Sequence, residues 1–148
     1  PTGKGQTVLI VDDEPAVLAV AEKILRLNGY KTLTAGDGRE AIRCLAQKRG
    51  SIDLVISDLV MPSMDGVTLL GLIRKMAPDI ALVASSGFKE ALGREKMARL
   101  KDLRAVPVLE KPYTIESLLA SVAAAVVPRT VSGQSGLPNP SPPREDST

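Results

Sequence analysis

The fold is decided by the stretch VLIVDDEP at residues 8–15. A short apolar run rich in β-branched residues is typical of a buried strand, and this one ends abruptly in Asp12 and Asp13. Further apolar runs also end in groups that can carry chemistry; in chain order these are Asp58 after residues 54–57, Ser86 after residues 80–84 and Lys111 after residues 106–109.

Strand and helix patterns alternate along the chain. Strands are expected at residues 7–11, 31–35, 53–57, 80–85 and 106–110. Helices are expected at residues 15–28, at 38–48 with Asp37 as N-cap, from Asp65-Gly66 to just before Pro78, at 89–102, and from the N-cap Thr114 to about Val126. This alternation predicts an α/β fold, a doubly wound parallel sheet that is covered by helices on both faces.

In such open sheets, sites form beyond the carboxyl ends of the strands. Because Asp12, Asp13, Asp58, Ser86 and Lys111 all lie at or just past those ends, we expect them to meet at one edge of the sheet.

The composition limits the possible functions. Apolar residues make up 44% of the 148 residues, enough for one core. The chain has 19 Lys and Arg and 17 Asp and Glu, so it lacks the excess of positive charge that is typical of proteins that bind nucleic acid directly. No run approaches the ~18 apolar residues of a membrane span. The single Cys44 fits a reducing compartment, so a cytoplasmic location is expected.

Three carboxylates at one edge would repel one another unless a cation neutralised them. Oxygen ligands favour Mg²⁺ or Mn²⁺, and the metal ligands expected are Asp12, Asp13, Asp58 and the backbone carbonyl of Val60. The alternative is that the acids of residues 12–14 only cap a helix. An acidic first loop also argues against a flavin or nucleotide fold, which needs amide-lined phosphate loops.

A carboxylate that ends a central strand can attack phosphorus and form an aspartyl-phosphate. Asp58 is the expected nucleophile. Lys111 would pair with a phosphoryl oxygen as a point charge, and the Ser86 hydroxyl would donate a hydrogen bond to another. Pro112 biases Lys111 toward an extended conformation, and a cis bond there would further fix the turn.

Four motifs occur in one order: VLIVDDEP at 8–15, ISDLVMPSMDG at 56–66, SSG at 85–87 and EKPY at 110–113. Over about residues 6–127 the chain resembles the receiver domain of two-component response regulators. The resemblance implies a flavodoxin-like, five-stranded sheet of order 2-1-3-4-5 with five helices.

The resemblance also implies roles and partners. Asp58 would be the phosphoacceptor, Asp12 and Asp13 the metal-binding acids, Ser86 the switch hydroxyl and Lys111 the phosphate-sensing lysine. The phosphodonor would be a phosphohistidine on a histidine kinase or histidine phosphotransfer domain, which suits a chain with no histidine. The domain would catalyse only its own phosphorylation and dephosphorylation.

The chain departs from the family pattern in two places. The aromatic often found three positions before the lysine is replaced by Val108, so an aromatic-flip output is not expected. The segment from Ser86 to Lys111 is longer than usual and holds a charged stretch at 94–104. That stretch is either a solvated helix face or part of a homodimer contact made by the fourth helix, fifth strand and fifth helix.

Val60 and Phe88 would flank the phosphorylation site as apolar residues, which leads us to expect slow hydrolysis of the phosphoryl group. From Arg129 the sequence is rich in Pro, Ser and Gly, so residues 128–148 are expected to form a disordered tail or linker. The missing initiator Met favours a piece of a longer protein, such as the receiver portion of a hybrid sensor histidine kinase. Two other functions remain open: a phosphorylation-independent interaction module, and an aspartyl-phosphate hydrolase.

Overall fold

The computed structural model describes residues 2–87, 93–103 and 106–126. Its strands are β1 (Thr7–Val11), β2 (Lys31–Ala35), β3 (Leu54–Asp58), β4 (Ala81–Ser86) and β5 (Val108–Glu110). Its helices are α1 (Pro15–Leu27), α2 (Gly38–Gln47), α3 (Gly66–Met76), α4 (Arg94–Asp102) and α5 (Ile115–Ala125). The expected tail at residues 128–148 lies outside the described residues.

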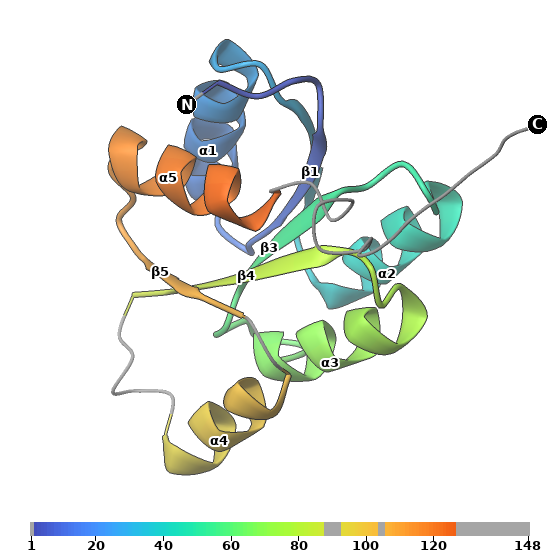
Figure 1. The fold of residues 1–148 in the computed structure, drawn as a ribbon. Helices are drawn as coiled ribbons and strands as arrows, with labels where there is room; N and C mark the ends of the chain where they lie inside the picture. The colour runs from blue at the N-terminus through green and yellow to red at the C-terminus, as the bar shows by residue number, and fades with distance from the viewer. Residues whose placement is uncertain (1, 88–92, 104–105, 127–148) are drawn as a thin grey trace, which may run out of the picture.

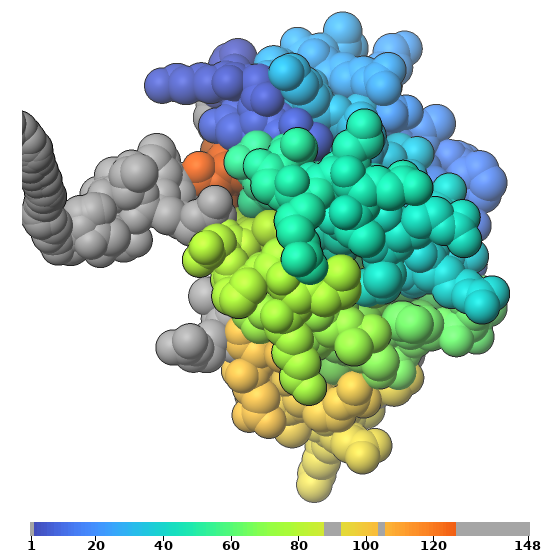
Figure 2. Space-filling model, turned by 90° about the vertical axis from the view of Figure 1, so that its right-hand side faces the viewer, coloured from blue at the N-terminus to red at the C-terminus, as the bar shows by residue number. Residues whose placement is uncertain are grey.

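The five strands form one parallel sheet in the order β2-β1-β3-β4-β5, as expected from the sequence. Helices α1 and α5 cover one face, and α2, α3 and α4 lie over the other (Figure 1). On that second side the three helices form one continuous surface (Figure 2). Among the described residues, no helix combines the length and the apolar character that crossing a membrane requires.

The apolar strands are explained by burial on both faces of the sheet. Along β1, Leu9 and Val11 enter the core beneath α2 and α3, whereas Val8 and Ile10 enter the core beneath α1 and α5. Successive side chains of a strand point to opposite faces, so a strand covered on both sides must be apolar throughout.

The ends of several helices follow the expected capping residues. Asp37 accepts a hydrogen bond from the Glu40 N–H at 2.8 Å, and Thr114 accepts one from the Ser117 N–H at 2.9 Å. Ser117 Oγ in turn accepts a hydrogen bond from the Thr114 N–H, so a capping box begins α5.

Some expected boundaries were wrong. Asp58 and Ser86 are the last residues of β3 and β4, because each still pairs with the neighbouring strand. Strand β5 is shorter than expected and begins after Pro107, which has no N–H to donate. Gly93 is the N-cap of α4 with a φ of 87°, so this helix begins at Arg94; residues 89–92 of the expected helix lie outside the described residues.

Only some of the regularly spaced apolar residues of α1 are buried. Ala21 and Leu25 are the buried residues of α1, whereas Val20 and Leu27 are exposed. The stripe that these residues form is therefore wider than the face that the sheet covers, and part of it faces outward next to the sheet edge that carries the acids.

Candidate functional site

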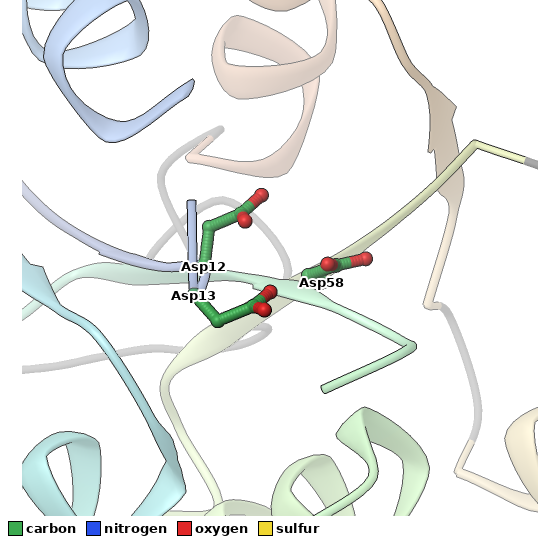
Figure 3. Close-up of side chains that lie close together, drawn as sticks. All are labelled: Asp12, Asp13 and Asp58. Carbon is green, nitrogen blue, oxygen red and sulfur yellow. The ribbon is translucent and has the colours of Figure 1, made fainter. Parts of the chain in front are cut away.

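The three expected acids meet at the carboxyl edge of the sheet. Asp12 follows β1 directly, Asp13 comes next, and Asp58 ends β3, which lies beside β1. One carboxylate oxygen from each lies within 4.8 Å of the others. Figure 3 shows the three side chains extending toward the same region. Asp12 and Asp58 are buried, with exposures of 0% and 5%, whereas Asp13 is exposed.

Lys111 reaches the same place from beyond β5. Its Nζ donates hydrogen bonds to Asp12 Oδ2 at 3.0 Å and to Asp58 Oδ2 at 3.2 Å. Burial alone would lower the pKa of Lys111, but these two carboxylates outweigh burial and raise the pKa above its usual value. Lys111 is therefore firmly cationic and neutralises part of the acidic cluster.

The surroundings of Asp58 disfavour its charged form. Burial raises its pKa, the ammonium of Lys111 opposes that shift, and the neighbouring Asp12 adds to it. The Val60 N–H also lies 3.4 Å from Asp58 Oδ1 and lowers the pKa. The net result is a raised pKa for Asp58, so an additional positive charge near this carboxylate would stabilise its ionised form.

The loop that follows Asp58 is held closely against the helix it leads into. The Gly66 N–H donates to the Leu59 carbonyl at 3.0 Å, and the Leu59 N–H donates to the Ser85 carbonyl at 2.9 Å. A Cβ added at Gly66 would overlap the Asp58 carbonyl oxygen and lie 2.6 Å from Leu59 Cα. A glycine at position 66 is therefore what allows β3 and α3 to approach this closely.

Ser86 ends β4 and is fully buried. Its carbonyl accepts a hydrogen bond from the Lys111 N–H at 3.0 Å, which fixes the backbone of Lys111 beside the site. Among the described residues the Ser86 hydroxyl has no hydrogen-bond partner. Because buried hydroxyls are nearly always paired, this one is available to a ligand group. The peptide bond between Lys111 and Pro112 is cis, the form that the sequence left open.

The helix-capping alternative accounts for only part of the acidic run. Glu14 is the N-cap of α1, but its side chain makes no capping hydrogen bond. Asp12 Oδ1 accepts a hydrogen bond from the Glu14 N–H at 3.0 Å, while its other oxygen faces Lys111. The Asp13 side chain extends toward the other acids (Figure 3). A divalent cation therefore fits the donor set, since buried carboxylate oxygens exceed the one ammonium that neutralises them.

Several neighbours of the site were not expected from the sequence. Glu14 Oε1 lies 3.7 Å from Lys111 Nζ as a third carboxylate partner. Tyr113 lies near the site: burial raises the pKa of its phenol, the Ser85 hydroxyl opposes that shift, and the charge of Asp12 adds to it. A groove of about 530 Å³ also opens between α1 and the segment after β5, and its lining includes Val17, Val20, Gly87, Pro112 and Tyr113. No signal in the sequence indicated this groove, because the spacing of apolar residues does not show which side chains of α1 face outward.

A family model described as the response regulator receiver domain matches residues 8–123. The chain belongs to this receiver-domain family. The order of the strands and the five helices agree with that assignment, so the fold is the flavodoxin-like fold expected from the motifs.

Curated relatives of this receiver domain are longer proteins. The sensor kinase CckA of Brucella abortus is 39% identical over 117 residues, which are 78% of this chain and 12% of that protein. The transcriptional regulatory protein PrrA of Mycobacterium tuberculosis is 36% identical over 117 residues, which are 79% of this chain and 48% of that protein. The chain therefore spans less than half the length of these two relatives.

Solved structures show the same architecture. The receiver domain of the hybrid histidine kinase CckA is 35% identical, with a TM-score of 0.69, and the alignment covers 82% of this chain and 99% of that one. The chemotaxis protein CheY4 of Vibrio cholerae is 28% identical with a TM-score of 0.73, covering 82% of this chain and 98% of that one. The chain is thus a receiver domain of two-component systems.

Proposed function

We propose that this receiver domain is a phosphorylatable switch in which Asp58 is the phosphoacceptor. The observation that carries the proposal is the environment of the Asp58 carboxylate. It is buried at the end of a central strand, has two other acids close by, and is bonded to Lys111 at 3.2 Å. A buried carboxylate beside a cationic group, with further acids that can hold a metal ion, suits phosphoryl transfer, because catalysis there is mainly positioning and charge neutralisation.

In the proposed step, an Asp58 carboxylate oxygen attacks phosphorus and forms the new oxygen–phosphorus bond. The bond from phosphorus to the donor imidazole nitrogen breaks, and its electron pair stays on that nitrogen. Lys111 moves from the free carboxylates to an oxygen of the incoming phosphoryl group, and the Ser86 hydroxyl donates to another. The roles of both residues rest on their positions around Asp58.

Asp12, Asp13, Asp58 and the Val60 carbonyl would hold Mg²⁺ or Mn²⁺. When bound, the cation supplies positive charge to the carboxylate and phosphoryl oxygens. The raised pKa of Asp58, which burial causes, supports this need for additional positive charge.

The phosphodonor must be a partner, since the chain contains no histidine. We propose a histidine kinase or a histidine phosphotransfer domain, with contact along the exposed apolar side of α1 and the groove beside Lys111. The likeness to CckA supports a place in a hybrid histidine kinase. The proposed setting is cytoplasmic, and neither direct nucleic-acid binding nor membrane insertion is part of the proposal.

The Val60 side chain is 57% exposed, so it can shield the phosphoryl group from water only together with other residues. Phe88, the second expected shield, lies outside the described residues. Slow hydrolysis stays a prediction, and loss of the phosphoryl group within minutes would count against it. Val60 also stands where a hydrolase would place an acid, which favours a switch over turnover of a separate substrate.

The test is intact-mass analysis after incubation with acetyl phosphate, with and without Mg²⁺. Wild type is expected to gain one phosphoryl group only when Mg²⁺ is present, and Asp58→Asn is expected to gain none. Asp79→Asn is the matched control, because Asp79 is exposed and precedes β4 at the opposite edge of the sheet. If folded wild type gains no phosphoryl group with either Mg²⁺ or Mn²⁺, the chain is a phosphorylation-independent interaction module instead.

A further inference from the structure

Ser85 carries a buried hydroxyl that the proposed reaction does not use. It pairs with Asp58 across β3 and β4, and its carbonyl accepts the Leu59 N–H, so its backbone is held against the phosphoacceptor. Its side chain is fully buried, and among the described residues its Oγ makes no hydrogen bond of good geometry. Leaving a buried hydroxyl unpaired costs about 1–3 kcal/mol, so a partner is expected in some state of the domain.

The Tyr113 phenol lies beside this hydroxyl. Burial raises the pKa of Tyr113, and the neighbouring Ser85 hydroxyl opposes that shift. The ring packs against the core beneath α1 and α5. Ser85 and Tyr113 therefore stand as close polar neighbours whose hydrogen bond is not completed in this structure.

The backbone connects Tyr113 directly to the site. The Lys111 N–H is bonded to the Ser86 carbonyl, and only Pro112 separates Lys111 from Tyr113. Ser85 and Ser86 are neighbours in β4, so their side chains point to opposite faces of the sheet. Ser86 can thus serve the phosphoryl group while Ser85 faces the core that holds Tyr113.

Lys111 cannot keep both of its present partners once the proposed phosphoryl group forms on Asp58. Its Nζ now lies between Asp12 and Asp58 at 3.0 and 3.2 Å. Lys111 and Tyr113 share one short segment, so a hydrogen bond that anchors the Tyr113 phenol to Ser85 would also hold the backbone from which the Lys111 side chain extends.

We propose that Tyr113 is a positioning residue for Lys111. In the transition state and in the phosphorylated domain its hydroxyl donates a hydrogen bond to Ser85 Oγ, which holds the Lys111 ammonium against the phosphoryl oxygens. The inference rests on the proposed function of Asp58. Val108, three positions before Lys111, has neither a ring nor a hydroxyl. In this chain the aromatic residue that acts on Lys111 is therefore Tyr113, two positions after it.

The test measures the rate at which acetyl phosphate adds a phosphoryl group at saturating Mg²⁺. Tyr113→Phe keeps the ring and removes only the hydroxyl, and Ser85→Ala removes the other half of the pair. Each is expected to slow phosphorylation by about threefold to tenfold, the range for one neutral hydrogen bond. The double variant is expected to be no slower than either single variant, because both changes delete the same bond.

Tyr30→Phe is the matched control. Tyr30 is buried in the same core, but it precedes β2 at the opposite end of the sheet. Its loss of a hydroxyl is expected to leave the rate unchanged. Combining Tyr113→Phe with Lys111→Met shows whether Tyr113 acts through the lysine, since its effect should then disappear.

Unchanged rates in Tyr113→Phe and Ser85→Ala would overturn the inference, whatever happens to their melting temperatures. The inference would also be overturned if the double variant were slowed by the product of the two single effects. It would be overturned as well if Tyr113→Phe slowed phosphorylation in the Lys111→Met variant as much as it does in wild type. Failure of the proposed function looks different: wild type itself would then gain no phosphoryl group.

Discussion

Lys111 lies between two buried carboxylates that would otherwise repel each other. It bonds to both Asp12 and Asp58, and its raised pKa shows that the carboxylates outweigh the cost of burial. Even so, burial leaves the pKa of Asp58 raised. One ammonium therefore does not fully neutralise the cluster, which is the physical reason to expect a second cation there.

Replacing Lys111 by Met is expected to destabilise the metal-free domain by about 2 kcal/mol. The change leaves Asp12 and Asp58 without their shared ammonium. Added Mg²⁺ is expected to stabilise this variant more than wild type, because the ion replaces the lost charge. Thermal unfolding with and without Mg²⁺ measures both effects.

Lys23→Met is the control for that variant, since Lys23 is exposed on α1. It is expected to change neither the stability nor the response to Mg²⁺. Equal responses to Mg²⁺ in Lys111→Met and wild type would contradict the shared-charge account.

Asp13→Asn separates metal binding from folding. Asp13 is exposed, so the metal-free stability is expected to stay within about 0.5 kcal/mol of wild type. Its carboxylate belongs to the acidic cluster, so the rise in melting temperature caused by Mg²⁺ should shrink clearly. An unchanged rise would remove Asp13 from the metal site.

At the scale of elements, the approach of β3 to α3 depends on the absence of a side chain at Gly66. Gly66→Ala is expected to cost about 3 kcal/mol, because its Cβ would overlap the Asp58 carbonyl and displace the backbone of Asp58. Gly71→Ala in the same helix is the control. There the nearest atom lies 4.0 Å away, so alanine is expected to stabilise by about 1 kcal/mol. Chemical denaturation of both variants measures the difference, and equal effects would refute the close-packing argument.

Asp65 is the N-cap of α3, and its ionisation makes the stability of the fold depend on pH. Burial would raise its pKa, but hydrogen bonds from the Thr68 N–H and hydroxyl, with the charges of Lys96 and Arg99, lower it. An acid with a lowered pKa in the folded state stabilises the fold above its unfolded pKa, and that contribution is lost as pH falls through the folded value.

Asp65→Ala is therefore expected to cost about 1 kcal/mol at pH 7, as for the loss of an N-cap. The difference from wild type should shrink as the pH falls below the ordinary aspartate pKa of about 4 and the wild-type carboxylate becomes protonated. Asp65→Asn retains an oxygen acceptor, so it should lower the free energy of unfolding at pH 7 by less than Asp65→Ala does. Urea unfolding across this pH range gives the comparison, and a difference independent of pH would contradict the role of charge.

The sequence predicted elements better than their ends. Alternating apolar runs and turn residues predicted the succession of strands and helices, and the resemblance of the motifs to the receiver family supplied the strand order. The ends were shifted because pairing with a neighbouring strand decides them: Ser86 stays in β4 through its pairing with Glu110. The exposure of Val20 and Leu27 could not be foreseen, since spacing does not show how wide a face the sheet covers.

The sequence also predicted which groups meet at the sheet edge, because strand ends of a parallel sheet share that edge. It did not predict the pairing of Lys111 with both Asp12 and Asp58, which depends on how far the lysine side chain reaches from beyond β5, past β4, to the ends of β3 and β1. Ser85 and Tyr113 were missed for a related reason: their proximity arises only after β4 and the segment beyond β5 pack together.

At the scale of the molecule, the site lies where both layers of helices meet the carboxyl edge of the sheet (Figure 1). The acids of β1 and β3 lie at its centre, and the groove between α1 and the segment after β5 opens beside them. A change at Asp58 can therefore reach both faces: through the loop into α3, and through Lys111 toward Tyr113 and α5.

The most direct test of the central claim is chemical mapping of the phosphorylated residue. The domain is phosphorylated with acetyl phosphate and Mg²⁺, reduced with borohydride, which converts an acyl phosphate to the alcohol, and digested for peptide mass analysis. The account predicts homoserine at Asp58 and unmodified Asp12 and Asp13. Homoserine at Asp12 or Asp13 instead, or none in a folded and metal-loaded domain, would contradict it.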